Sequence, residues 1–159
     1  MCGEVNEALA GNTVSLTGWV NKRRDLGPLI FITLRDRTGI VQITVDQTKI
    51  SEELYNKAVS VRGEYVLAVR GTVYLRTEEN INPEMKTGKI EVFAEELLIL
   101  SEAETPPFSI MDQGVKEDMR LKYRYIDLRR PELQKTLETR HNALQFVHKF
   151  FSENGFAIV

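Results

Sequence analysis

Two predicted strands carry a phenylalanine and a glutamine on the face that should point away from the core. In residues 28–36 and 40–46, aliphatic residues occupy alternate positions and should share the buried face. These aliphatic residues are Ile30, Ile32, Leu34, Val41, Ile43 and Val45. In a hairpin, Phe31 and Gln42 then lie about one diagonal apart on the outer face. Because a ring stacks on a base while an amide reads a base edge through a donor and an acceptor, the pair predicts a platform for single-stranded nucleic acid.

A basic cluster precedes these strands. Its members are Lys22, Arg23 and Arg24. Their charged groups can hold phosphate oxygens or base acceptors beside Phe31. In a second interpretation, residues 102–116 or Trp19 cover Phe31, and the basic cluster is a solvated turn. The aromatic, the amide and the cluster together favour binding.

A polar stretch between the last two predicted strands adds further candidates. These are Arg76, Asn80, Asn82 and Glu91. Amides and a carboxylate suit base edges better than phosphates, since a glutamate accepts from a cytosine amino group but repels the backbone. The alternative is a turn rich in asparagine because asparagine tolerates unusual backbone angles.

The elements that must position these residues follow a β-rich order. Strands are predicted at 13–20, 28–36, 40–46, 63–76 and 88–100, with a helix at 51–60 after the third strand. The helix begins with a serine cap, and Gly39 can supply the positive φ of a tight hairpin. Three strands, a helix and two strands predict a mainly β protein with the five-stranded Greek-key barrel called the OB-fold.

The chain changes character after this barrel. We expect an OB domain at 1–102, a linker or hinge at 103–131 that contains Pro106-Pro107, and a helical segment at 132–159. A short helix is predicted at 116–127 and a longer one from Pro131 to about Asn154, with an apolar stripe. The closing sequence FAIV resembles the start of a strand, so we expect a fragment of a longer protein.

Composition restricts the other possibilities. The net charge of −2 and pI of about 5.8 give no global attraction for nucleic acid, so binding must come from a local patch. The single Cys2 excludes an internal disulfide framework, and no apolar run approaches the roughly 20 residues of a membrane span. His141 and His148 lack a third ligand nearby, so no metal site is predicted. We expect a soluble, cytoplasmic chain with no membrane contact.

Three stretches carry a resemblance to a known family. They are GWVNKRRDLGPLIFITLRDRTGIVQITV, ENINPEMKTGKIEVFAEELLIL and LKYRYIDLRRPELQ. The chain resembles the N-terminal part of the bacterial-type aspartyl-tRNA synthetases, class II ligases in which an anticodon-binding OB domain precedes the catalytic domain. The resemblance covers nearly the whole chain.

This resemblance implies roles for the candidate residues. Phe31 matches the aromatic that stacks on the middle anticodon base, Gln42 the amide that reads the same uracil, and Arg24 a basic residue beside the anticodon. The loop candidates match residues that contact the flanking bases, with Glu91 the partner of a third-position cytosine. Lys22 stands where many relatives have arginine, which keeps the charge but loses the planar fork.

The resemblance also implies what the parent protein does. The parent would form aspartyl-adenylate from ATP and aspartate with Mg²⁺, transfer aspartate to tRNA, and dimerise through motif 1, which begins at residues 132–159. Because motifs 2 and 3 are absent, we expect this chain alone to be inactive and to hold no cofactor. The alternatives are a fragment of an asparaginyl- or lysyl-tRNA synthetase, a free-standing single-strand-binding OB module, and an interaction domain that pairs through helix 132–154.

Overall fold

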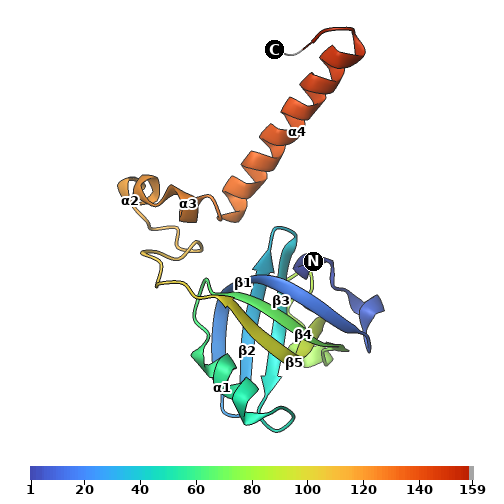
Figure 1. The fold of residues 1–159 in the computed structure, drawn as a ribbon, viewed down its shortest axis with the longest axis vertical. Coiled ribbons are helices and arrows are strands. Elements are labelled where there is room, and N and C mark those ends of the chain that lie inside the picture. Colours follow the sequence, from blue (N-terminus) through green and yellow to red (C-terminus); the bar gives the residue numbers. More distant parts are fainter. Residues whose placement is uncertain (158–159) are drawn as a thin grey trace. The chain divides into compact units, whose positions relative to one another are not determined.

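Five strands close into a barrel in the computed structural model, which describes residues 1–157 (Figure 1). The strands are β1 (Thr13–Leu26), β2 (Leu29–Asp36), β3 (Gly39–Asp46), β4 (Val66–Leu75) and β5 (Ile90–Ser101). They follow one another around the barrel as β1-β2-β3-β5-β4, with β3 and β5 parallel and the other neighbours antiparallel. The predicted mainly β, five-stranded OB barrel is confirmed.

The barrel core is built from the aliphatic positions that the sequence pattern predicts to face inward. Ile30, Ile32, Leu34, Val41, Ile43 and Val45 are all fully buried. Burying such side chains contributes about 1.5–3 kcal/mol each to folding. The same alternation leaves Phe31 half-buried on the other face of β2.

Strand β1 continues to Leu26, past the predicted end at Val20. The prediction ended early because a β-bulge interrupts the alternation of side chains after Val20. The register partners change from Val20–Leu34 to Lys22–Thr33, so Asn21 is the extra residue. Its polar continuation still pairs with β2 down to the turn at Gly27.

A single helix, α1 (Glu52–Ser60), lies between β3 and β4 in the sequence and at one end of the barrel (Figure 1). The Ser51 side chain accepts a hydrogen bond from the backbone N–H of Leu54, which caps the first turn as predicted. At the β2–β3 turn, Gly39 has the expected positive φ of 145°. Short 3₁₀ segments lie at Cys2–Glu4, Glu7–Leu9 and Glu78–Asn80.

The chain divides into two compact units, Met1–Thr105 and Pro106–Val159. The second unit contains α2 (Glu117–Lys122), α3 (Arg124–Asp127) and α4 (Pro131–Glu153). One helix was predicted at 116–127, but non-helical angles at Tyr123, φ −110° and ψ 47°, divide it into two. A small apolar cluster of Phe108, Ile110 and Ile126 makes the segment before α4 an ordered element.

A buried carboxylate ties this segment together. Asp127 is fully buried and accepts hydrogen bonds from the guanidinium groups of Arg120, Arg124 and Arg130. Hydrogen bonding to Arg120 is the main cause that holds the pKa of Asp127 below its usual value. Arg130 also donates from Nη2 to the backbone oxygen of Asp112, at 2.7 Å.

Helix α4 buries none of its residues within the described chain. Its predicted apolar stripe is therefore exposed, including Leu137, Leu144, Val147 and Phe151. Of the predicted closing strand, residues 156 and 157 have no regular structure, and residues 158–159 lie outside the described residues. No helix within residues 1–157 is long and apolar enough to cross a membrane.

Candidate nucleic-acid interface

A groove of about 540 Å³ lies on the outer face of the barrel. It brings together every candidate that the sequence singled out except Lys22 and Arg23. These candidates are Arg24, Phe31, Gln42, Arg76, Asn80, Asn82 and Glu91. The groove is further lined by Leu26, Leu29, Thr44, Asp46, Lys49 and Phe93.

One row of paired residues crosses the groove. Arg24, Phe31, Thr44, Phe93 and Thr72 are successive register partners on β1, β2, β3, β5 and β4. Neighbouring strands lie about 4.8 Å apart, so the two phenylalanines are about 10 Å from each other. The row presents aromatic rings separated by one small polar residue, an arrangement that suits stacked bases.

The second row contains Gln42, a candidate for reading a base edge. Gln42 pairs with Thr33, which places it diagonally to Phe31 as predicted. Its Nε2 donates to Oε2 of Glu91 at 3.3 Å, and the Thr44 hydroxyl donates to the same carboxylate oxygen. These bonds fix the amide and leave its carbonyl oxygen as an acceptor, while Oε1 of Glu91 is free to accept from a base.

Arg76 is incompletely satisfied in this groove. Its Nη1 approaches the backbone oxygen of Asn80 at 3.4 Å, whereas Nε and Nη2 are buried and have no hydrogen-bond partner among residues 1–157. Burial lowers the pKa of Arg76; the Glu91 charge opposes this effect and the Arg24 charge adds to it. The side chain stays protonated at neutral pH, because an arginine guanidinium is always charged in proteins. Two buried donors without acceptors suit a ligand that brings acceptors, such as a base edge or a phosphate.

The basic cluster is divided between two faces by the alternation of strand β1, and the bulge at Asn21 decides which of its members face the groove. Arg24 lines the groove and Lys22 pairs with Thr33 on the same side. Arg23 points elsewhere: its guanidinium binds the Asp25 carboxylate and donates to the backbone oxygens of Val59 and Val61. Arg23 therefore holds the end of α1 and is not brought together with the other candidates.

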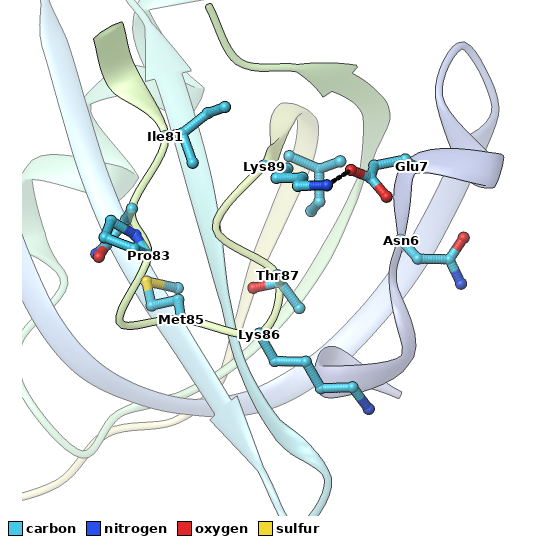
Figure 2. Close-up of a pocket in the computed structure, with 10 residues that line it drawn as sticks. Asn6, Glu7, Ile81, Pro83, Met85, Lys86, Thr87 and Lys89 are labelled. Atoms are coloured by element: carbon cyan, nitrogen blue, oxygen red, sulfur yellow. Dashed lines mark ion pairs between the residues drawn. The ribbon is translucent and has the colours of Figure 1, made fainter. Parts of the chain in front are cut away.

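The loop that carries Asn80 and Asn82 packs against the N-terminal segment on the side away from the groove. Figure 2 shows a second hollow, of about 320 Å³, between this loop and the N-terminal segment, in which Lys89 and Glu7 point toward one another. Their Nζ–Oε1 distance is 2.7 Å. The loop backbone passes so close to Gly88 that a Cβ there would lie 1.8 Å from the oxygen of Asn82.

The loop asparagines have structural contacts as well. Asn82 Oδ1 accepts from the backbone N–H of Glu84 at 3.0 Å, and Asn80 Nδ2 donates to the Thr77 hydroxyl at 2.8 Å. The first bond is the local turn that the alternative interpretation expected. Each bond uses one end of the amide, so the other end remains for a base.

The other six residues that line the groove were not named as candidates from the sequence, and three of them have groups that suit binding. Phe93, Thr44 and Lys49 line it, and the Lys49 ammonium lies 4.9 Å from the centre of the Phe93 ring. The period-two pattern that found Phe31 also exposes Phe93, since Ile90, Val92 and Ala94 are buried. Lys49 carries no such signal because it follows the end of a strand.

The barrel and the groove define a class of protein. The chain belongs to the family of OB-fold nucleic acid binding domains, whose family model matches residues 14–100. Residues 116–159 match the family model of class II tRNA synthetases (D, K and N).

Two relatives that match nearly the whole chain narrow this class. An aspartate–tRNA(Asp/Asn) ligase from Symbiobacterium thermophilum is 54% identical over 98% of this chain, and the match covers 26% of that ligase. An aspartate–tRNA ligase from Bacillus licheniformis has the same identity and coverages, 54%, 98% and 26%. The resemblance to aspartyl-tRNA synthetases is confirmed, and the chain spans about a quarter of the length of these relatives.

Solved structures agree with the fold. The asparaginyl-tRNA synthetase of Pyrococcus horikoshii matches with a TM-score of 0.83 at 26% identity, over 99% of this chain and 36% of that chain. The aspartyl-tRNA synthetase of Entamoeba histolytica matches with a TM-score of 0.90 at 20% identity, over 100% of this chain and 38% of that chain. The second likeness, at its low identity, shows the fold alone.

Proposed function

We propose that this chain recognises the anticodon loop of aspartate tRNA as part of an aspartate–tRNA ligase that works in cytoplasmic translation. One observation carries the proposal: the groove holds a stacking ring, an oriented amide and an arginine with two buried, unpaired donors. The aspartate–tRNA ligases that match 98% of the chain supply the tRNA and the amino acid. Because these relatives are aspartate ligases, asparagine and lysine ligases are less favoured parents.

Each groove residue takes a distinct role in this proposal. Phe31 stacks on the middle base, and Gln42 reads the edge of that base as a uracil. Arg24 and Lys22 hold the backbone, whereas Arg76 supplies its unpaired donors to a base or phosphate. Asn80 and Asn82 contact flanking bases through the ends of their amides that the loop does not use.

The first test compares two anticodon stem-loops, one with GUC and one with the middle U replaced by A, at fixed low salt. The GUC loop should bind more tightly to the natural chain, and Phe31→Ala should weaken it about 10-fold, because stacking contributes about 1–3 kcal/mol per base. Leu98→Ala is the matched control, since Leu98 is exposed on β5 outside the groove. Thermal unfolding verifies that each barrel is folded.

Equal binding of both loops would instead support a single-strand-binding module without decoding. Failure of both loops to bind would contradict RNA recognition by this groove. An unchanged preference in Phe31→Ala would remove Phe31 from the decoding role.

The third anticodon base distinguishes aspartate from its alternatives. Glu91 keeps one carboxylate oxygen for a cytosine amino group, so a change of the third base from C to U should weaken binding. In Glu91→Ala the two loops should bind alike. A preference for U over C would favour an asparagine or lysine parent.

The parent's chemistry belongs to the proposal as well. We propose that the parent binds ATP and Mg²⁺ outside this chain, because the chain spans about a quarter of the length of the matching ligases. We also propose residues 1–102 as the anticodon domain, 103–131 as a linker and 132–159 as the start of the catalytic domain. On this division the chain alone should not form aspartyl-adenylate, which pyrophosphate exchange would measure.

A homodimer is a second proposal, favoured by the exposed apolar stripe of α4. Apolar patches of this kind mark interaction surfaces. Light scattering should report self-association of the chain, and Leu137→Gln with Leu144→Gln should abolish it. A monomer at all concentrations would contradict pairing through this helix.

A further inference from the structure

A third hollow, of about 510 Å³, adjoins the groove that holds Phe31 and Gln42. It is distinct from the hollow beside Lys89 and Glu7. The groove and the third hollow share three lining residues, Asp46, Lys49 and Phe93, so one surface continues from the groove into the hollow. The hollow extends to Tyr74 and Thr72 on β4 and to Glu95 on β5. No role in decoding falls to this region in the proposal above.

Tyr74 offers a stacking face in the hollow. Its ring makes an edge contact with Phe93, with centroids 5.1 Å apart, and 51% of the residue is exposed. Lys49 lies over Phe93, so the Tyr74 ring is the more accessible of the two. An exposed aromatic beside a groove that suits stacked bases can take a further base.

A β-bulge turns Glu95 toward this hollow. Arg70 pairs with Glu96 and Gly71 with Ala94, which leaves Glu95 as the extra residue of β5. Gly71 permits the close strand approach, because a Cβ there would lie 2.0 Å from the oxygen of Phe93. The Thr72 hydroxyl donates to Oε1 of Glu95 at 2.6 Å and so orients the carboxylate.

The charges of the hollow select a base rather than a phosphate. Glu95 and Asp46 are acidic and face a single cation, Lys49. A carboxylate has about four acceptor positions, of which Thr72 occupies one on Glu95. It repels phosphate but accepts from the exocyclic amino group of adenine, cytosine or guanine.

We propose that this hollow binds the base of a nucleotide that flanks the anticodon, with the base stacked on Tyr74 and its amino group bound to Glu95. This inference rests on the proposed anticodon function. From Phe31 on β2 to Tyr74 on β4 the path crosses three strand spacings, about 14 Å. Stacked nucleotides advance about 3.4 Å each, so a few nucleotides span the distance.

The test uses the full chain and stem-loops that carry GUC with a single abasic site at each flanking loop position in turn. One abasic site should weaken binding by the natural chain about 10-fold and should have no effect on Tyr74→Ala. With uracil at that position, affinity should also fall, and Glu95→Ala should abolish this dependence on the base. Glu96→Ala is the matched control, because Glu96 pairs with exposed Arg70 outside the hollow.

The outcomes separate this inference from the anticodon function. If Tyr74→Ala keeps the preference for GUC over the middle-A loop but shows no coupling to any flanking base, the hollow is not a nucleotide site and anticodon recognition stands. If Tyr74→Ala weakens all loops equally, abasic ones included, Tyr74 acts through the packing of Phe93 and the inference is wrong. If no loop binds the natural chain, both proposals fail.

Discussion

Arg130 is buried and Arg76 is half-buried, and these two arginines differ in what they contact. Arg130 donates to buried Asp127 and to a backbone oxygen, and lies over the Phe108 ring. Arg76, in the groove, has two buried nitrogens without partners among the described residues. A buried cation with a full set of partners stabilises the fold, whereas one with unmet donors carries a cost that a ligand can remove. The comparison therefore separates a structural site from the proposed binding site.

The largest expected effect is at the structural site. Arg130→Met should destabilise the segment 106–131 by about 3 kcal/mol, because removing one partner of a buried ion pair leaves the other uncompensated. Amide hydrogen exchange of residues 106–131 measures this loss. Exposed Lys135→Met is the control and should leave protection unchanged. Unchanged exchange in Arg130→Met would refute the structural role.

Replacing Arg76 with methionine should affect affinity for RNA and not stability. Arg76→Met should leave the midpoint of urea unfolding unchanged or slightly higher, because it removes unpaired donors from a buried position. Affinity for the GUC stem-loop should fall about 10-fold, since a good arginine contact to a base contributes about 1–3 kcal/mol. A marked loss of stability without loss of affinity would show that Arg76 has a structural role and does not bind RNA.

Acid provides a third test. Hydrogen bonding to Arg120 lowers the pKa of Asp127, so this carboxylate stabilises the fold above its unfolded pKa of about 3.9. That contribution should disappear as the pH falls from about 4 through the lowered folded value. Hydrogen exchange of residues 106–131 should therefore lose protection in this range, and Asp127→Asn should be less protected at neutral pH and less sensitive to acid. An identical loss of protection in acid in the natural chain and in Asp127→Asn would show that ionised Asp127 does not stabilise this segment.

The smallest effect distinguishes two adjacent arginines. Arg24→Gln should reduce the slope of log affinity against log salt by about 0.7, the value for one phosphate contact to a single strand. Arg23→Gln should leave the slope unchanged, because that side chain binds Asp25 and the end of α1. An equal change in both slopes would place Arg23 in contact with RNA.

Local alternation was enough to predict most of the barrel and the centre of the groove. The buried triplets of β2 and β3 fix the diagonal of Phe31 and Gln42, because a period of two leaves only one alternative face. Alternation also separates Arg23 from Arg24, but which of the two faces the groove could not be predicted. That choice depends on the bulge at Asn21, which has no distinctive residue pattern.

Tertiary contacts account for features that alternation does not show. Asp127 contacts three arginines in the segment that contains the break at Tyr123, whereas the sequence alone presents this carboxylate as one more exposed acid. Similarly, the orientation of Gln42 depends on Glu91, which lies 49 positions further along the chain. Barrel closure brings Gln42 and Glu91 together, so this pair leaves no local signal in the sequence.

The row from Arg24 to Thr72 takes one side chain from each of the five strands. No hairpin or half-barrel reproduces it, so recognition arises only with complete closure. During synthesis, the chain would not bind tRNA until β5 had left the ribosome and inserted between β3 and β4. RNA binding and barrel closure would then be linked, and the tRNA would itself stabilise the finished fold.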